Sequence, residues 1–255
     1  MDYSLTVGLS DYQAEITKYD NPNGSLASGM YYEGQKLGEI WGYVTDGYIM
    51  DDFEAAKMNY VQKYISSKWY PGDIRYKDLN GDGVINDDDR GYLGKNSTPD
   101  KIVGLALSGN WKNFDFSVLF QAALGGNTWF TGSAIWPFES KASVSQDVLN
   151  NYWSTNNTAE QNANVFYPRL SSDHSDNNYI ESTYWLKSSD YLRLKNVEIG
   201  YRLPKSVNKF LGVEELRFYA NAVNLITWDH MKIFDPESPN GAVNYPQTVS
   251  YTHLT

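Results

Sequence analysis

The sequence predicts an all-β protein whose antiparallel strands are long enough to cross a lipid bilayer, and three observations support this. Apolar and polar residues alternate with a period of two along several segments. Aromatic residues are abundant, with 21 tyrosines, 8 tryptophans and 10 phenylalanines, and tyrosine is common in strands and in the interfacial belts of membrane barrels. The connections between the patterned segments alternate in length, as they do in an outer-membrane barrel.

The first two strands are predicted near the start of the chain. From Tyr3 to Leu9 every second residue is apolar and the residues between them are small or polar, which is typical of a strand with one apolar face. Residues 38–50 are rich in aromatic side chains and are interrupted by glycines. We expect them to form a second strand.

A hairpin over residues 101–124 is the clearest element of the pattern. Its arms are separated by a tight turn at Lys112-Asn113, and each arm has one bulky apolar parity and one small or polar parity. Each arm has about the 9–11 residues that a tilted strand needs to cross a bilayer. The bulky parity consists of Val103, Leu105, Leu107, Trp111, Phe114, Phe116, Val118, Phe120 and Ala122.

Three more strands are predicted in the second half, at residues 191–203, 216–223 and 245–255, the last being short and weakly patterned. Within the first of these the apolar parity shifts near Lys195-Asn196, which predicts a β-bulge. Two short helices are predicted in the connections, one turn over residues 206–211 and a piece over 143–153 with Ser143 or Ser145 as its cap.

The connections between the predicted strands are very unequal. Residues 112–113 and 204–214 are short and residues 20–37 are intermediate, whereas the long connections are 51–100, 125–190 and 229–244. In chain order the long connections alternate with the shorter ones, so all of them lie at one end of the strands. Outer-membrane barrels have short periplasmic turns and long extracellular loops. The pattern therefore favours a barrel whose long loops are extracellular.

Residues 78–89 have the ligand spacing of an EF-hand calcium loop, although no EF-hand helices can be drawn around them. Oxygen donors stand at loop positions 1, 3 and 5 (Asp78, Asn80 and Asp82), the carbonyl of Val84 at position 7 and Asp89 at position 12. Aspartate at position 12 reaches less far than glutamate, so we expect a modest affinity, sufficient for extracellular sites that work near ~10⁻⁴–10⁻³ M. The sequence predicts a structural calcium ion that braces an extracellular loop. The alternative is a solvated acidic turn.

Aromatic residues are concentrated in the connection 125–190. They are candidates for contact with a sugar or with a partner protein, because aromatic rings offer a large apolar face together with a polar edge. The alternative, which the sequence alone favours, is that the rings pack on one another within the loop. The candidates are Trp129, Phe130, Trp136, Phe138, Tyr152 and Trp153.

The composition argues against several classes of function. The formal net charge of −10 disfavours a nucleic-acid partner, and the absence of cysteine removes disulfides and thiol chemistry. The three histidines are scattered, and no phosphate-binding loop or nucleophile motif is present. We therefore expect no enzyme. No apolar run approaches the roughly 20 residues of a membrane-spanning helix.

Several blocks in a fixed order resemble the C-terminal part of the SusC/RagA family, the TonB-linked outer-membrane transporters of Bacteroidetes. The most specific block runs from Pro71 to Asp78 and continues through Asn80-Gly81-Asp82-Gly83. Another is Leu192–Val197, followed by Gly200-Tyr201 and Leu203-Pro204. The remaining blocks are Glu33-Gly34, Trp41-Gly42-Tyr43, Asp46-Gly47-Tyr48, Asn224-Leu225, Phe234–Glu237 and Tyr245-Pro246-Gln247.

This resemblance implies that residues 1–255 form the C-terminal part, about seven antiparallel strands, of a 22-stranded barrel with a plugged lumen. It also implies the cell outer membrane as location, a SusD-like lipoprotein as partner, and import of oligosaccharides or peptides with energy delivered through TonB. The plug domain, the TonB contact and an accessory domain are expected upstream. Residues 249–255 stop short of the terminal aromatic residue usual in the family, so we expect an incomplete closing strand.

Two other functions are compatible with the residues alone. A secreted, calcium-stabilised β-sandwich that binds glycans would use the loop at 78–89 and the loop aromatic residues. A glycan-degrading enzyme would need a carboxylate pair, and none stands out among the many acidic residues. A plug domain and a signal peptide upstream in the reading frame would distinguish the transporter from both.

Overall fold

The computed structural model describes residues 1–24, 30–94, 98–133, 135–139, 143–172, 177–231, 234–237 and 249–254. The chain divides into two compact units. Unit 1 consists of Met1–Gln13, Ser97–Asn127 and Ser188–Thr255, and unit 2 of Ala14–Asn96 and Thr128–Lys187.

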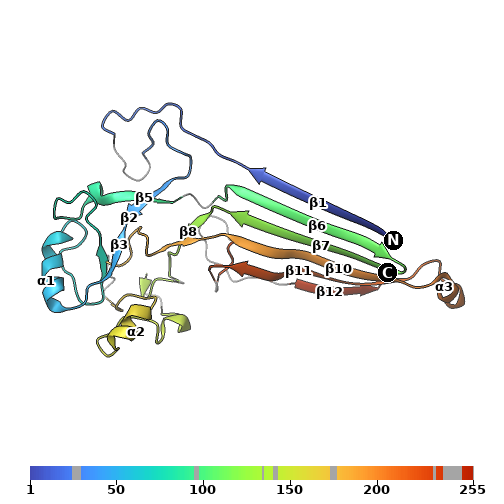
Figure 1. Ribbon diagram of the computed structural model, residues 1–255. Coiled ribbons are helices and arrows are strands. Elements are labelled where there is room, and N and C mark those ends of the chain that lie inside the picture. Colours follow the sequence, from blue (N-terminus) through green and yellow to red (C-terminus); the bar gives the residue numbers. More distant parts are fainter. Residues whose placement is uncertain are drawn as a thin grey trace. The chain divides into compact units, whose positions relative to one another are not determined.

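Unit 1 is built on a six-stranded sheet in the order β1-β6-β7-β10-β11-β12, in which every neighbouring pair is antiparallel (Figure 1). The sheet confirms the predicted strands at residues 3–9, 101–124, 191–203 and 216–223. Its strands are β1 (Asp2–Asp11), β6 (Lys101–Trp111), β7 (Phe114–Leu124), β10 (Tyr191–Arg202), β11 (Arg217–Asp229) and β12 (Val249–Leu254).

The strand register places the apolar parities on one face of this sheet. Leu5 pairs with Leu107, Leu107 with Val118, Val118 with Val197 and Val197 with Ala222. Cross-strand partners lie on the same face, so apolar side chains run without interruption across the sheet. One face of unit 1 is therefore apolar over five neighbouring strands.

The opposite face is polar, as the neighbouring register row demonstrates. Ser4 pairs with Ser108, Ser108 with Ser117, Ser117 with Glu198 and Glu198 with Asn221. Successive residues of a strand point to opposite faces, so these residues lie on the other side of the sheet from the apolar row. The sheet thus has one apolar face and one polar face.

Two local predictions in unit 1 are confirmed. The register of β10 shifts between Leu194 and Asn196 against both of its neighbours, at the position where the β-bulge was predicted. Lys195 is the extra residue against β7, whereas against β11 the two residues Asn224 and Leu225 lie opposite Lys195. The helical turn predicted at 206–211 is α3 (Lys205–Leu211), in the short connection between β10 and β11. The closing strand forms as β12, while residues 245–248 of that predicted strand lie outside the described residues.

Unit 2 consists of short elements around an aromatic-rich core. Ile49, Ile74, Ile85 and Trp185 are fully buried there. Two of its small sheets are β2 with β5 and β3 with β4, and β8 pairs with β9 where the two units meet in the chain. The elements are β2 (Ile40–Tyr43), β3 (Thr45–Tyr48), α1 (Asp52–Val61), β4 (Ile74–Tyr76), η1 (Asp87–Asp89), β5 (Arg90–Gly94), β8 (Asn127–Trp129), η3 (Gln146–Val148), α2 (Ala159–Asn164) and β9 (Leu186–Ser188).

The predicted strand at residues 38–50 does not join the large sheet, which therefore has six strands where about seven were expected. It is divided into β2 and β3 within unit 2. Gly47 has a φ of +83°, and a Cβ at Gly42 would lie 2.6 Å from the carbonyl oxygen of Glu181. These glycines bend the segment and let it pass close to another backbone. Residues 12–100 are consequently one long connection between β1 and β6.

Helices in the long connections were poorly predicted, unlike the turn at 206–211. The piece at 143–153 contains only the 3₁₀ turn η3, and Ser145 precedes it without a capping hydrogen bond from its side chain. In contrast, α1 and α2 were missed although both carry capping signals: Asp51 caps Glu54, and Thr158 and Gln161 form a capping box. No helix in the described ranges is long and apolar enough to span a membrane.

Candidate functional site

The loop at residues 78–89 lies between β4 and β5, and its side-chain oxygens accept hydrogen bonds from its own backbone. Asp78 accepts from the amides of Gly81 (2.6 Å) and Gly83 (2.8 Å). Asn80 accepts from the amide of Asp82 (2.8 Å), and Asp82 accepts from that of Val84 (2.9 Å). The amide donors, that of Gly83 first, hold the pKa of Asp78 below its ordinary value. The three side chains predicted as first ligands thus lie along one exposed turn.

Asp89, the predicted ligand at position 12, closes the loop from inside. Its carboxylate is fully buried and accepts from the amides of Leu79 (2.7 Å) and Asn86 (2.9 Å). Ile85 is also fully buried, and its amide donates to the carbonyl of Val61 at the end of α1 (2.6 Å). The loop is therefore anchored to unit 2 at its second half.

The donor set of this loop has the right chemistry for a hard cation, because it offers carboxylate, amide and carbonyl oxygens and no nitrogen or sulfur. Each carboxylate oxygen has further lone pairs beyond those used by the amides. Among the described residues, however, no group of three or more acidic, histidine or cysteine side chains is gathered closely enough to hold a metal. A cation would therefore require neutral ligands, Asn80 and the carbonyl of Val84, beside the aspartates.

Asp73 is the centre of a buried polar network that sequence reasoning missed. Its fully buried carboxylate accepts from Asn177 Nδ2 (2.8 Å), from Asn178 Nδ2 (3.0 Å) and from the amide of Tyr70 (3.0 Å). It also forms an ion pair with Arg169, with 2.6 Å between Nε and Oδ1. The network joins chain segments about a hundred residues apart, so this aspartate holds the connections of unit 2 together.

Gly72, next to Asp73, has a structural reason to be glycine. Its φ is +87°, and a Cβ there would lie 2.6 Å from Cδ2 of Trp153 and 2.9 Å from Cβ of Arg169. Trp153 is itself buried. The Pro71–Asp78 block is therefore a packing and hydrogen-bonding unit, and Trp153 is part of its support.

The six aromatic candidates mostly pack within unit 2. Phe130 and Trp153 are buried, while Trp129, Phe138 and Tyr152 are half-buried. The ring of Trp136 stacks on Tyr179 with 5.0 Å between centroids and an interplanar angle of 9°. These contacts support self-packing for most of the set.

Two of the candidates nevertheless reach a cavity. Trp129 and Trp136 line a space of about 440 Å³, together with Tyr179, Trp185 and the carboxyl-bearing Glu139 and Glu181. Burial raises the pKa of the Tyr179 hydroxyl, which donates to the carbonyl of Pro137 (2.8 Å). This aromatic cavity is one candidate contact site of unit 2.

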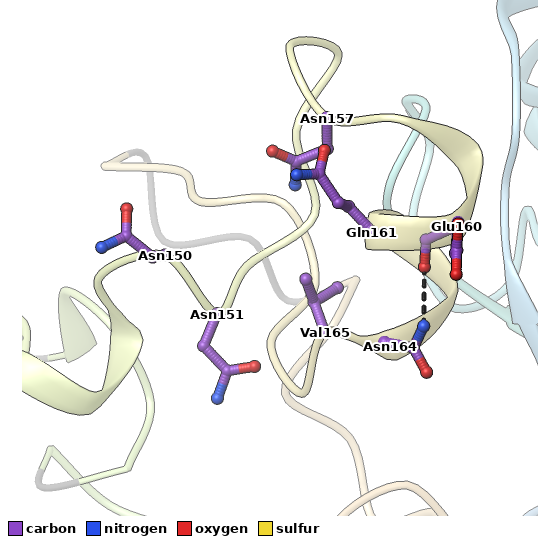
Figure 2. A pocket seen from close by; sticks show the side chains of 7 residues that line it. All are labelled: Asn150, Asn151, Asn157, Glu160, Gln161, Asn164 and Val165. Carbon is purple, nitrogen blue, oxygen red and sulfur yellow. Dashed lines mark hydrogen bonds between the residues drawn. The ribbon is translucent and has the colours of Figure 1, made fainter.

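A second cavity, of about 430 Å³, is lined mainly by amides around α2 (Figure 2). Most of these amides already serve the local fold: Asn151 accepts from the amide of Phe166 (2.8 Å), Gln161 accepts from that of Thr158 (2.8 Å) and Asn164 donates to the carbonyl of Glu160 (2.8 Å). The amides that line this cavity therefore stabilise the local turns around α2, and we do not regard the cavity as a contact site.

The polar face of the large sheet carries two ion-pair clusters. Arg193 is buried and contacts Asp235 (2.5 Å) and Glu237 (2.7 Å), and Lys195 at the bulge also contacts Glu237 (2.6 Å). The second cluster joins Asp115 of β7, Glu198 and Arg202 of β10, and Arg217 of β11. These contacts hold the charged side chains against the sheet.

Comparison with known proteins gives a consistent set of relatives, although no family model matches the chain. TonB-dependent receptor P3 of Formosa agariphila is 30% identical over 206 residues, which are 81% of this chain and 19% of that receptor. TonB-dependent receptor SusC of Bacteroides thetaiotaomicron is 28% identical over 202 residues, or 77% of this chain and 19% of SusC.

The fold has a counterpart among solved structures. A structure of the RagAB peptide transporter covers 98% of this chain with a TM-score of 0.63 and 22% sequence identity, and the match takes up 26% of that transporter chain. A structure of the RagAB peptide importer in its open-open state gives a TM-score of 0.61. The chain spans about a fifth of the length of the curated relatives that it matches.

Proposed function

The chain belongs to the SusC/RagA family of TonB-dependent receptors, and from this premise we propose that it supplies the C-terminal barrel portion of a transporter that imports nutrients across the outer membrane. The fold, a large antiparallel sheet with long connections at one end, is that of part of a transmembrane barrel. The import activity would belong to the whole receptor, of which this chain would be one part.

The observation that carries the proposal is the two-faced sheet of unit 1. Its apolar row from Leu5 to Ala222 suits contact with lipid, and its polar row from Ser4 to Asn221 suits a hydrated lumen. A β-sandwich would need a second large sheet to cover the apolar face, whereas the other sheets of the described residues have two strands each.

Membership of this family supports a proposal for the substrate and the partners. We propose that the receptor imports oligosaccharides or peptides, that a SusD-like lipoprotein covers its extracellular side, and that a segment upstream of this chain contacts TonB. The curated relatives are named as receptors, and one structural neighbour is described as a peptide transporter. This supports transport over catalysis, and the aromatic cavity at Trp129 and Trp136 is the candidate contact site.

We also propose that the loop at 78–89 binds calcium as a structural ion. Asp78, Asn80 and Asp82 would supply side-chain oxygens, Val84 its carbonyl and Asp89 the closing carboxylate. A bound cation would offset the mutual repulsion of the acidic side chains in this turn. Its role would be to order an extracellular loop.

A pair of substitutions in the full-length receptor tests the lipid-facing assignment. Lysine at a lipid-facing midplane position costs about 2–4 kcal/mol. Leu107→Lys should therefore lower the amount of folded receptor in the outer membrane, measured by heat-modifiable migration, whereas Ser108→Lys on the polar face should lower it less. Equal effects, or a larger effect of Ser108→Lys, would overturn the assignment.

Transport is tested by deleting the gene. The deletion strain should lose growth on the limiting oligosaccharide or peptide that the receptor imports, and a strain without TonB should show the same loss. The SusD-like partner should be recovered with the purified receptor. Growth that is unchanged on every oligosaccharide and peptide supplied would contradict the proposed import.

A further inference from the structure

The helix α3 exposes apolar side chains in the short connection between β10 and β11. Phe210 is 88% exposed, Leu211 51% and Val207 38%. At 100° per residue these three positions fall on one side of the helix. Single exposed apolar residues are ordinary, but a contiguous group usually marks a surface that meets something apolar.

Hydrogen bonds on another side of the helix attach α3 to the neighbouring backbone. Asn208 is buried and donates from Nδ2 to the carbonyl of Leu203 (3.2 Å). The amide of Val213 donates to the carbonyl of Asn208 (3.0 Å), after a left-handed C-cap at Gly212. The attachment is polar, so the apolar side of α3 is left over for another contact.

The opposite side of α3 is basic. Lys205 and Lys209 lie one turn apart, and both are exposed. A helix with aromatic and aliphatic residues on one side and lysines on the other is typical of the water–lipid interface, where the lysine stems extend toward the headgroups.

The end of the sheet that bears α3 also carries a row of aromatic side chains on the apolar face. In the register Trp111 pairs with Phe114, Phe114 with Tyr201 and Tyr201 with Phe218. Trp111, Phe114 and Phe218 are each about half exposed. Aromatic girdles of this kind mark the boundary between lipid and water in barrels.

The apolar column of β10 leads directly to the helix. Ile199 and Tyr201 belong to it, and Leu203, whose amide donates to the carbonyl of Leu216 (2.9 Å), continues their parity. α3 begins two residues later (Figure 1). Along the chain, α3 therefore comes directly after the apolar column of β10, beyond the aromatic row.

We propose that α3 is an interfacial membrane anchor. Val207, Phe210 and Leu211 insert among the phospholipid headgroups at the short-connection end of the barrel, and Lys205 and Lys209 meet the lipid phosphates. The inference rests on the proposed function, because it takes the apolar face of the sheet to be lipid-facing. Continuity with that face and the two lysines favour lipid over a protein as the occupant.

Spin labels on single cysteines test this in the full-length receptor, reconstituted in phosphatidylethanolamine and phosphatidylglycerol. This chain contains no cysteine. Each introduced cysteine is therefore the one labelling site within residues 1–255. The ratio of collisions with oxygen to collisions with a water-soluble nickel chelate should be several-fold higher at Phe210→Cys than at Lys209→Cys. Leu211→Cys provides a second reading, and Ile199→Cys serves as the lipid reference on the sheet.

Each outcome of the spin-label experiment either supports or overturns the membrane anchor. A high ratio at 210 and 211 supports the anchor. Frequent collisions with the nickel chelate at these positions mean that α3 lies in water, and protection from both reagents means that a protein covers it; either result overturns the inference. If Ile199→Cys reports lipid in those cases, the proposed barrel function stands. A water-exposed label at Ile199 would contradict the proposed barrel function as well.

Discussion

Arg217 of β11 and Asp115 of β7 form a two-bond ion pair across β10, the strand that lies between theirs. The distances are 3.1 Å from Nε to Oδ1 and 2.5 Å from Nη2 to Oδ2. The two side chains meet over Gly200, where a Cβ would lie 2.6 Å from Asp115 Oδ2 and closer still to the guanidinium. Glycine at this position therefore permits a charge-assisted contact between strands that are not neighbours.

Gly200→Ala should weaken the large sheet, because the added methyl group would displace the Asp115–Arg217 pair. Overpacking of this kind costs about 1–3 kcal/mol. The temperature at which the purified full-length receptor loses its heat-modifiable migration should fall. Gly104→Ala is the matched control, since its register partner is the polar-face residue Gln121 and a Cβ there meets nothing within 4 Å. An equal effect of both changes would contradict the role assigned to Gly200.

Asp73→Ala should loosen the connections of unit 2. It removes the acceptor for Asn177 and Asn178 and leaves Arg169 without its buried carboxylate, and breaking a buried ion pair in this way costs about 3–5 kcal/mol. Limited proteolysis of the full-length receptor should then cut within residues 51–94 or 143–187. Asp46→Ala, which removes an exposed partner of Arg75, should leave the cleavage pattern unchanged; similar cleavage in both variants would argue against a central role for Asp73.

Asp78→Ala combined with Asp82→Ala should abolish calcium-dependent protection of residues 78–89. The double change removes two of the charged oxygen donors at the predicted ligand positions. Protease digestion of the full-length receptor with calcium or with a chelator gives the measurement. Asp88→Ala, at loop position 11, removes one negative charge outside the ligand pattern and should keep the protection. Protection that survives the double change would refute the site.

Alkaline pH should destabilise unit 2 between about pH 10 and 12. Burial, with the Asp87 carboxylate next in importance, raises the pKa of Tyr43 from 10.0 to about 12. The folded state holds the neutral phenol of Tyr43. The stability that this phenol contributes is therefore complete below pH 10 and is lost as the pH rises toward 12. The difference in tyrosinate absorbance between the receptor and its Tyr43→Phe variant should therefore titrate above pH 10. A titration centred at 10 would contradict the buried position of this hydroxyl.

The strands of unit 1 were predictable because each carries a local signal. The hairpin at 101–124 has a strict period of two. The β-bulge in β10 is visible in the local sequence, because the apolar parity changes within a few residues of Lys195. The predicted strand at 38–50 failed for a local reason as well, since Gly42 and Gly47 support bends and close backbone approach as readily as a strand interior. The missed helix α1 had its capping signal in Asp51 and Glu54.

The candidate sites were less predictable, because their partners are distant in the chain. Nothing near Asp73 indicates that Asn177, Asn178 and Arg169 surround it. The six loop aromatic residues all belong to unit 2, yet burial separates Phe130 and Trp153 from Trp129 and Trp136, which reach the cavity. Their individual roles depend on packing that composition does not encode.

By itself the sequence determined the strand segments, their two parities, the uneven connections and the order of its motif blocks, because all of these are local or linear properties. The tertiary structure decided which strands are neighbours, that Gly200 makes room for Asp115 and Arg217, and that Asp73 joins distant connections. Such features depend on contacts between residues far apart in the chain, and their geometry exists only once the backbone has folded.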